Sequence, residues 1–399
     1  MRMTLAVLAA TAAAAVAGCA TAAPAASTPA ASTPALPAPA APHAEGGGTT
    51  SNLYDIGCLT SSHCFAVGDA GTLLATTDGG RAWHREASPA GVAAPLYRIA
   101  CAAPASCYMI ARPGTILVTH DAGAHWAAHA LPVHVPALAL TGCVVGDASN
   151  PQGEVPCRLG LLDISCPSAL TCYAVATGPG GWSTNLLSRG AGPGSSLWLT
   201  QNGGVTWTSQ PIPRGVVCNG DCSSTPYGYP LEWVSCAPSG PCWAGGNQLI
   251  GSHEGFAAAW LMTQAPGGSW RLEPGCPPGT CSEPVTDVGA CPTSTGCYAV
   301  NNSSPFGDGS NVSSYTATGQ NGPGVTVPSG LVINDIACPA ARTCYAVGAA
   351  GTILLTTNGA RFTPLKTLVR ENLNGITCVT ASDCYAVGSA GTIEVLYEG

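Results

Sequence analysis

The chain has 399 residues, of which only 9% are charged, and its formal net charge at pH 7 is -8. Nucleic acid is held mainly by clustered lysine and arginine, which release counterions. A sparsely charged, acidic chain with 13 basic residues therefore argues against a nucleic-acid partner. The length fits two or three ordinary domains, or one repeat array that closes on itself.

The N-terminus has the features of an export signal. Arg2 precedes an apolar run, Leu5 to Val16, that is too short for a permanent transmembrane helix. The run ends at Cys19 in the sequence VAGC, which resembles a bacterial lipobox, where this cysteine is diacylated and becomes the mature N-terminus. A plain secretory signal cleaved at a nearby small residue is the alternative. Residues 1–18 are thus predicted to be a lipoprotein signal peptide, and two or more acyl chains would anchor the protein stably to the outer face of the cytoplasmic membrane.

Residues 20–44 are almost entirely alanine, proline, serine and threonine, with no hydrophobic period. Such a composition cannot form a core. As extended polyproline II, at about 3.1 Å per residue, it would hold the next domain tens of ångströms from the membrane. We therefore predict a tether over residues 19–50 and one folded domain over residues 51–399.

The remaining twenty cysteines show a repeat. An even number of cysteines in an exported chain indicates disulfides. Seven pairs share the spacing C-x5-C and define repeats 1 to 7, in order: Cys58 and Cys64, Cys101 and Cys107, Cys166 and Cys172, Cys236 and Cys242, Cys291 and Cys297, Cys338 and Cys344, and Cys378 and Cys384. Three further pairs lie between repeats: Cys143 and Cys157, Cys218 and Cys222, and Cys276 and Cys281. Zinc sites prefer two to four residues between paired ligands and need four converging ligands, so we expect disulfides and no metal.

Each repeat contains short β-branched or aromatic segments separated by glycine and proline, which is typical of strands. The first strand ends at the first cysteine and the second begins at the second cysteine. A third strand follows a glycine, as in Gly71 to Thr77 or Gly351 to Thr357, and a tryptophan leads the fourth. Four strands repeated seven times predict an all-β, seven-bladed β-propeller with one C-x5-C disulfide per blade.

The last repeat ends after its third strand, Gly391 to Tyr397. Two alternatives remain open for this blade. It has three strands, or a segment near Ala40 to Glu45 supplies the fourth.

The turn between the third and fourth strands carries the pattern Ser/Thr-x-Asp-x-Gly-x-Thr-Trp, complete or in part. Its main residues are Asp78, Trp83, Asp121, Trp126, Asn202, Trp207 and Asn358. The pattern resembles the Asp-box, or BNR repeat, of a propeller superfamily that includes sialidases and non-enzymatic assembly factors related to the photosystem II stability factor. We interpret the box as structural: its carboxylate or amide and its hydroxyl accept backbone N–H groups, glycine takes the positive φ, and tryptophan packs between blades.

Large insertions are expected on one face. Strands in a blade alternate in direction, so the long segments 177–196, 245–256 and 301–314, between second and third strands, share a face with the three extra cysteine pairs. We call this the loop-rich face, over repeats 2 to 5, and expect it to bind a protein or a glycan at the cell envelope. The candidate residues are Trp182, Asn185, Arg189, Tyr227, Tyr229, His253, Glu254, Phe306 and Asp308. The alternative is that these insertions have no function and that their disulfides only protect them from proteolysis.

No catalytic set emerges from the sequence. The sialidase resemblance implies an arginine triad, a Tyr/Glu pair and an acidic acid/base, but the Arg-Ile-Pro signature is absent, because Arg98 is followed by Ile99 and Ala100. We expect a monomeric, non-catalytic protein without cofactors, with a drifted glycoside hydrolase as the alternative.

Two clusters of polar residues remain. Asp55, Asp163 and Asp335 stand three residues before the first cysteine of their repeats, where Arg98, Trp233 and Gly375 stand in others. A structural role at the strand start is favoured over a role in lining the channel. The histidines at 120, 125, 129 and 134 straddle a box turn and an outer strand, so their side chains are expected to diverge and bind no metal.

Overall fold

The computed structural model describes most of the predicted propeller. All described residues belong to the compact unit Pro39–Gly399. They are residues 43–46, 48–89, 92–102, 104–111, 114–132, 160–177, 195–212, 231–238, 240–250, 255–263, 267–272, 288–293, 296–301, 309–316, 322 and 324–396. None of them forms a helix long and apolar enough to cross a membrane.

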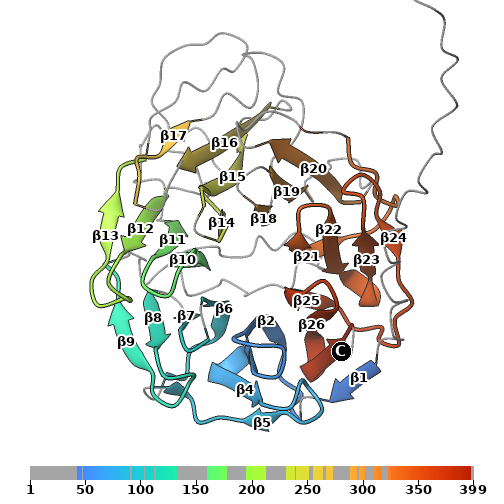
Figure 1. The fold of residues 1–399 in the computed structure, drawn as a ribbon, viewed down its shortest axis with the longest axis horizontal. Coiled ribbons are helices and arrows are strands. Elements are labelled where there is room, and N and C mark those ends of the chain that lie inside the picture. The colour runs from blue at the N-terminus through green and yellow to red at the C-terminus, as the bar shows by residue number, and fades with distance from the viewer. Residues whose placement is uncertain are drawn as a thin grey trace, which may run out of the picture. The chain divides into compact units, whose positions relative to one another are not determined.

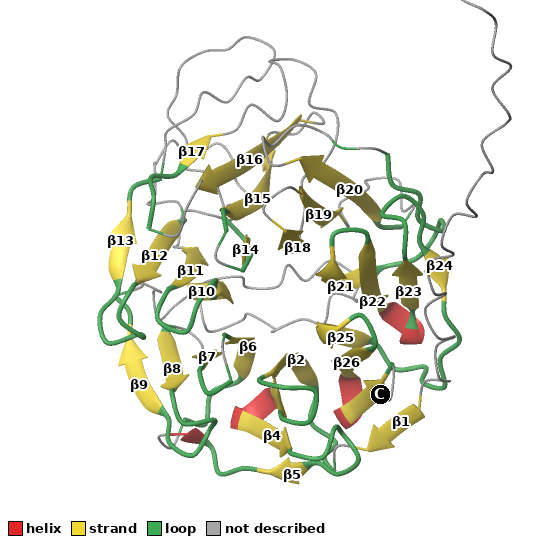
Figure 2. Cartoon of the chain, in the orientation of Figure 1, coloured by secondary structure: helices red, strands yellow, loops and turns green. Residues whose placement is uncertain are grey.

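The described residues form antiparallel sheets in which consecutive strands pair (Figures 1 and 2). Repeats 1 to 3 contain β2 (Leu53–Cys58), β3 (Cys64–Gly68), β4 (Thr72–Thr76) and β5 (His84–Arg85); β6 (Leu96–Cys101), β7 (Cys107–Ala111), β8 (Thr115–Thr119) and β9 (Ala127–Ala130); and β10 (Gly160–Ser165), β11 (Cys172–Thr177), β12 (Ser196–Thr200) and β13 (Thr208–Gln210). Repeats 4 and 5 contain β14 (Trp233–Cys236), β15 (Cys242–Ile250), β16 (Gly255–Thr263) and β17 (Arg271–Leu272); and β18 (Val288–Thr293), β19 (Gly296–Asn301) and β20 (Asn311–Thr316). Repeats 6 and 7 contain β21 (Ile333–Ala340), β22 (Thr343–Gly348), β23 (Ile353–Thr356) and β24 (Thr363–Pro364); and β25 (Leu373–Thr380), β26 (Asp383–Gly388) and β27 (Thr392–Val395).

The first strands of the repeats contact one another in chain order, β2, β6, β10, β14, β18, β21 and β25, and β25 returns to contact β2. The sheets therefore form a closed ring with these strands on the inside (Figure 1). This is the all-β propeller architecture that the repeats predict.

The prediction of a seven-bladed propeller is wrong. Within the described residues, six sheets are complete four-stranded blades, but the sheet of repeat 5, β18-β19-β20, has three strands. The cause lies in the segment after β20. Gly322 donates one backbone hydrogen bond to Ser314, and Thr326 then pairs in parallel with Arg361 of repeat 6. The described residues from Thr326 on thus pair with the neighbouring repeat.

The N-terminal segment completes the last sheet. β1 (His43–Gly46) pairs antiparallel with β27, from His43 opposite Val395 to Gly46 opposite Thr392. Of the two alternatives, the N-terminal strand is therefore correct, although it begins three residues later than expected.

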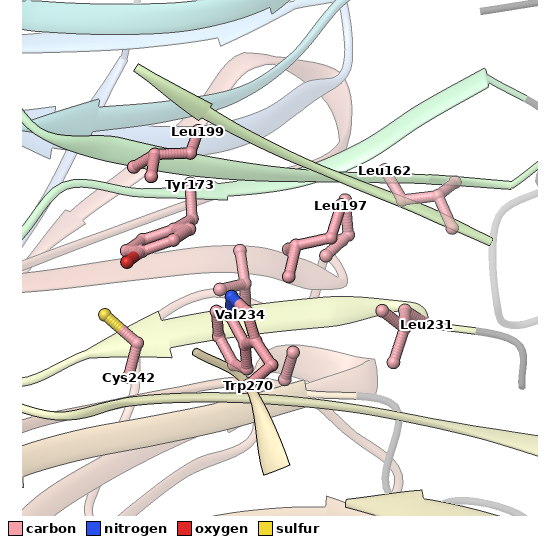
Figure 3. Close-up of a cluster of buried hydrophobic side chains, with 10 residues drawn as sticks. Leu162, Tyr173, Leu197, Leu199, Leu231, Val234, Cys242 and Trp270 are labelled. Carbon is pink, nitrogen blue, oxygen red and sulfur yellow. The ribbon is translucent and has the colours of Figure 1, made fainter. Parts of the chain in front are cut away.

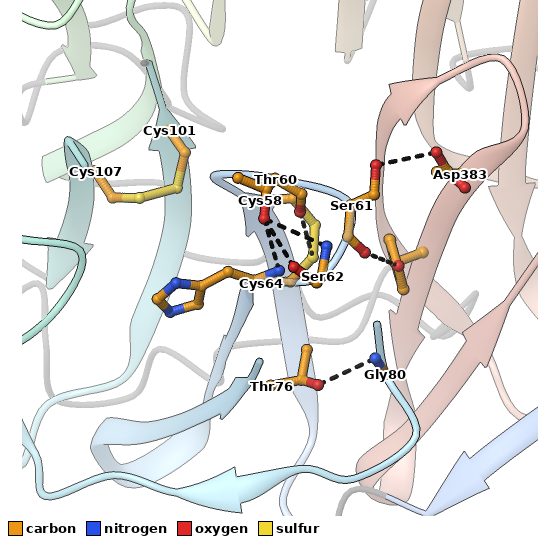
Figure 4. Close-up of a disulfide and its surroundings, with 12 residues drawn as sticks. Cys58, Thr60, Ser61, Ser62, Cys64, Thr76, Gly80, Cys101, Cys107 and Asp383 are labelled. Atoms are coloured by element: carbon orange, nitrogen blue, oxygen red, sulfur yellow. Dashed lines mark hydrogen bonds between the residues drawn. A yellow bond between two sulfur atoms is a disulfide. The ribbon is translucent and has the colours of Figure 1, made fainter. Parts of the chain in front are cut away.

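Each C-x5-C pair forms a disulfide across the hairpin of the first and second strands. Cys58 and Cys64, for example, stand directly opposite each other, with Cα atoms 4.0 Å apart (Figure 4). The other six predicted pairs are bonded likewise, with Cα separations of 4.0 to 4.1 Å: Cys101 with Cys107, Cys166 with Cys172, Cys236 with Cys242, Cys291 with Cys297, Cys338 with Cys344, and Cys378 with Cys384.

The remaining cysteine predictions lie outside the described residues. This applies to the lipidation candidate Cys19 and to the three pairs expected between repeats, which are Cys143 with Cys157, Cys218 with Cys222, and Cys276 with Cys281. These three disulfides stay predictions from the even cysteine count.

The core lies between neighbouring sheets. One cluster packs Leu162, Tyr173 and Leu197 of repeat 3 against Val234 and Trp270 of repeat 4 (Figure 3). Second strands such as β3 and β7 are buried at every residue, because a sheet lies against each of their faces. Burial of this apolar area, at about 25 cal/mol per Å², is the main force that joins the repeats.

The turns between second and third strands differ among repeats. In repeats 1, 6 and 7 they are short 3-10 turns, η1 (Asp69–Gly71), η4 (Ala349–Gly351) and η5 (Ser389–Gly391), as expected. In repeat 4 the expected insertion, 245–256, is mostly strand, because β15 and β16 stay paired out to Ile250 opposite Gly255. Residues 311–314 of the insertion expected in repeat 5 likewise belong to β20.

Candidate functional site

The Asp-box turns have the predicted structural role. Thr76 Oγ1 accepts the Gly80 N–H at 3.0 Å (Figure 4). It also donates to Asp78 Oδ1 at 2.8 Å, and Asp78 Oδ1 accepts the Ala82 N–H at 3.0 Å. The turns around Asp121, Asn202 and Asn358 repeat this arrangement. The acceptor side chain thus serves the backbone of its own turn, and aspartate and asparagine serve equally well.

The box tryptophans pack between sheets, also as predicted. Trp83 contacts the core shared by repeats 7 and 1, and Trp126 and Trp207 occupy the same place one and two interfaces further on. The indole nitrogens of Trp83 and Trp207 are buried with no hydrogen-bond partner among the described residues. These side chains contribute apolar area rather than polar contacts.

A tyrosine directly after the second cysteine of the repeat links neighbouring repeats, a role that the sequence did not reveal. Tyr345 Oη donates to the backbone carbonyl of Ala381 in the next repeat at 2.9 Å, and Tyr385 Oη donates to that of Ser61. Tyr108 and Tyr298 make the same bond to the carbonyls of Ala169 and Ala341. Burial raises the pKa of Tyr108 to about 12, so this hydroxyl remains a donor at neutral pH. The recurring CYAV sequence was the available signal, but the acceptor is a backbone carbonyl and carries no side-chain signature.

The three aspartates of the inner strands clamp neighbouring repeats together. Asp55 accepts the N–H of Ile56 on its own strand and the N–H of Ile99 on β6, both at 2.8 Å. Asp335 does the same with Ile336 and with Ile376 on β25, both at 2.9 Å. Asp163 accepts the N–H of Val234 on β14 at 2.9 Å. These hydrogen bonds agree with the structural role expected for the three aspartates. Each carboxylate joins two neighbouring repeats of the ring.

Arg98 provides the charge that these carboxylates share. Its Nε lies 3.6 Å from Asp163 Oδ1, with side chains 24% and 19% exposed, and it also interacts electrostatically with Asp55 and Asp335. Burial alone would lower the pKa of Arg98, but the three carboxylates raise it, so the guanidinium stays charged. We call Asp55, Arg98, Asp163 and Asp335 the inner-ring cluster.

The carboxylates of the inner-ring cluster have raised pKa values. Burial raises the pKa of Asp55 to about 7, in opposition to Arg98 and to the two backbone N–H donors, which lower it. Burial likewise raises the pKa of Asp163 to about 6 and that of Asp335 above its ordinary value. One guanidinium therefore does not offset the burial of three carboxylates, and their pKa values stay above the ordinary value.

The other inner strands fill the same position without charge. Trp233 is 1% exposed, and Gly245 and Gly289 have no room for a Cβ because its indole lies against both. Gly375 leaves space for the backbone of β2, since a Cβ there would come within 2.7 Å of Asp55 Cα. The inner ring is thus closed by hydrogen bonds in some interfaces and by packing in others.

The residue before each of these positions lies in a β-bulge in five inner strands, where the register shifts. Bulges redirect side chains. Asn334 and Asn374 use this to donate to the carbonyls of Leu373 and Leu53 in the next repeat, both at 2.8 Å. Tyr54 and Tyr97 are the bulge residues of repeats 1 and 2, and their rings stack at 4.6 Å.

The described histidines have different partners. His120 contacts Ser106 Oγ at 3.0 Å and the carbonyl of Gly203 at 2.8 Å, whereas His125 pairs with Asp121 at 2.6 Å on the surface. Within the part of the chain that the structure describes, no three His, Cys, Asp or Glu residues converge on a metal position. His134 lies outside the described residues.

The candidate binding residues of the loop-rich face lie outside the described residues as well. This applies to Trp182, Asn185, Arg189, Tyr227, Tyr229, His253, Glu254, Phe306 and Asp308. By strand direction, the starts of the inner strands point toward the same side of the ring as the turns between second and third strands.

The chain is a BNR-type β-propeller. This class is defined by the closed ring of sheets, the Asp-box turns and the tryptophans that pack between sheets. The family model described as photosynthesis system II assembly factor YCF48 matches residues 46–149. No curated protein matches the chain.

Several solved structures share the fold. A structure of YCF48 bound to D1 peptide is 15% identical, with a TM-score of 0.58 over 92% of this chain and 99% of that one. YCF48 from Cyanidioschyzon merolae is 17% identical, with a TM-score of 0.55 over 90% and 99%. The GH74 xyloglucanase from Xanthomonas campestris is 12% identical, with a TM-score of 0.52 over 88% of this chain and 53% of that one. At such identities the likeness concerns the fold.

Proposed function

We propose that this chain is a non-catalytic propeller of the cell envelope that binds a protein partner on its loop-rich face. The observation that carries the proposal is the state of the inner-ring cluster. The carboxylates that a propeller enzyme could use as acid and base here accept backbone N–H groups across the ring. Their hydrogen-bonding capacity maintains the scaffold, which leaves recognition to the loops.

The comparisons support a protein as the partner. The matching family model describes an assembly factor, and one similar propeller was solved with a bound peptide. The aromatic residues that the sequence places on the loop-rich face, such as Trp182 and Tyr229, are of the kind that dominates protein interfaces. A glycan ligand would contact similar residues. The experiment below distinguishes a glycan ligand from a protein partner.

Chemical cross-linking on intact cells, followed by affinity capture and mass spectrometry, tests this proposal. We expect one dominant partner with the wild-type protein and its loss in the double variant Trp182→Ala with Tyr229→Ala. The matched control is Leu170→Ser with Val205→Ser, which changes two apolar residues, 56% and 67% exposed, on the opposite face. Equal capture by both double variants, or binding only to a glycan array, would contradict the proposal.

A glycoside hydrolase is the second candidate, favoured by the raised pKa values of Asp55 and Asp163, which fall in the range of catalytic acids. Assays with sialosides and xyloglucan decide between the two. Turnover of either substrate by the wild-type protein would establish the enzyme and overturn the binding function.

We propose that lipid at Cys19 holds the protein at the envelope as a monomer. The sequence support is the cysteine that closes the apolar run. Fractionation should find the wild-type protein with membranes and Cys19→Ala in the soluble or secreted fraction. The same distribution for both proteins would exclude the anchor.

A further inference from the structure

The inner-ring cluster joins repeats that are far apart in sequence. Following the ring, Asp335 spans repeats 6 and 7, Asp55 spans 1 and 2, Arg98 reaches from 2 to 3, and Asp163 spans 3 and 4. Asp335 and Asp55 interact electrostatically across the intervening Gly375. A change of charge at one member therefore affects several interfaces at once.

The charges of the cluster do not balance when every group is ionised. Three carboxylates then interact electrostatically with one guanidinium, and Asp55 and Asp335 are each only 8% exposed. Like charges at such low exposure repel one another with little screening. Protonation of one carboxylate removes repulsion yet preserves the clamp, because a protonated carboxyl retains acceptor capacity and gains an O–H donor.

The surroundings add no second cation among the described residues of these strands. β2 and β6 carry Tyr54 and Tyr97 next to Asp55 and Arg98, and Glu232 directly precedes β14. β18 and β25 carry the uncharged Val288 and Gly375 at the same level. Among the described residues that act on the three carboxylates, Arg98 is the cation, and the backbone N–H donors add to its effect.

We propose that the inner-ring cluster makes closure of the propeller sensitive to protons, so that the inner strands are held tightly in mildly acidic medium and open more often when all three aspartates ionise. The sensor sits at the starts of the inner strands, toward the loop-rich face. It is independent of whether that face binds a protein.

The sign follows from linkage. A carboxylate whose pKa is higher in the folded protein than in the unfolded chain, where it is about 3.9 for Asp, binds protons more tightly when folded. The stability that it contributes is complete below the unfolded value and is lost as the pH rises through the folded value. For Asp55 and Asp163 this loss falls between pH 5 and 8.

Hydrogen exchange of the intact protein measures the effect at the clamps themselves. The amides of Ile99, Val234 and Ile376 are the donors across three interfaces. After correction for the intrinsic exchange rate, we expect the opening constants of these amides to rise by about tenfold or more between pH 5 and 8. Each proton that the protein releases on opening changes the opening constant by up to about tenfold per pH unit. The melting temperature should fall over the same interval.

Three variants make the test decisive. Asp55→Asn removes one titrating group and should flatten the profile. Arg98→Gln removes the cation, raises the pKa values of the carboxylates and should shift the profile to higher pH. Asp78→Asn is the matched control, since repeats 3 and 6 have asparagine at that place, and should keep the wild-type profile.

A flat wild-type profile, or a profile unchanged in both Asp55→Asn and Arg98→Gln, would overturn the proposal. If Asp55→Asn fails to fold, the shift in Arg98→Gln and the wild-type profile still decide the outcome.

Discussion

Replacement of Asp335 by alanine tests the clamp most sharply. The carboxylate accepts the Ile336 and Ile376 N–H groups at 2.9 Å, and both donors lose their acceptor in Asp335→Ala. A buried donor left unsatisfied costs about 1–3 kcal/mol, which gives about 2–6 kcal/mol for two. Removal of a carboxyl whose pKa is raised by burial offsets part of this cost. We therefore expect a loss of about 2–3 kcal/mol in the free energy of unfolding at neutral pH.

Urea denaturation of the oxidised protein, followed by tryptophan fluorescence, measures this loss. Asp78→Asn is the control and should leave the midpoint in place, because asparagine already fills this role in other Asp-boxes. An Asp335→Ala midpoint equal to that of the wild type would refute the clamp. It would also return the carboxylate to the pool of candidate catalytic groups.

Three further predictions concern the remaining contacts between and within repeats. Tyr385→Phe removes the hydroxyl that donates to the Ser61 carbonyl and should cost about 1 kcal/mol in denaturant unfolding. Replacing both Cys338 and Cys344 by alanine opens a short disulfide loop and should lower stability by about 2 kcal/mol under oxidising conditions, with no difference from the wild type once both are reduced. Ala350→Gly should raise the melting temperature, with up to about 1 kcal/mol gained, because Ala350 has φ of 53°, where glycine is unstrained.

Each of these has a result that would count against it. If Tyr385→Phe has the same free energy of unfolding as the wild type, the hydroxyl forms an equally good hydrogen bond with water. An unchanged stability of the double cysteine variant would mean that the hairpin is fixed by its sheet alone. A destabilised Ala350→Gly would place the backbone of this turn outside the left-handed region.

The sequence predicted well those features that depend on local spacing. Five residues between paired cysteines suit a hairpin neck, as at Cys58 opposite Cys64, and the box turn around Asp78 needs only its own neighbours. The position of Asp55, three residues before the cysteine, likewise pointed to a structural role. The succession of short strands and turns was predicted from the glycines and prolines between the β-branched and aromatic segments.

Features that depend on non-local contacts could not be predicted. Among the described residues, the sheet of repeat 5 has three strands, and the pairing of Thr326 beyond it with Arg361 is not encoded by local propensity. The tyrosine bonds end on backbone carbonyls of the next repeat, as with Ala381, where any residue would serve. The segment that ends at Ile250 was predicted to be a loop. It is a strand because β15 and β16 stay paired along their whole length, out to Ile250 opposite Gly255.

The most direct test of the account is a disulfide map of the oxidised protein, obtained by proteolysis and mass spectrometry without reduction. A ring of separate sheets requires that each C-x5-C pair close within its own hairpin, as Cys378 does with Cys384. We predict all seven linkages within hairpins. Free thiols at these positions, or sulfurs joined between different repeats, would contradict the ring, the clamps and the binding face that they support.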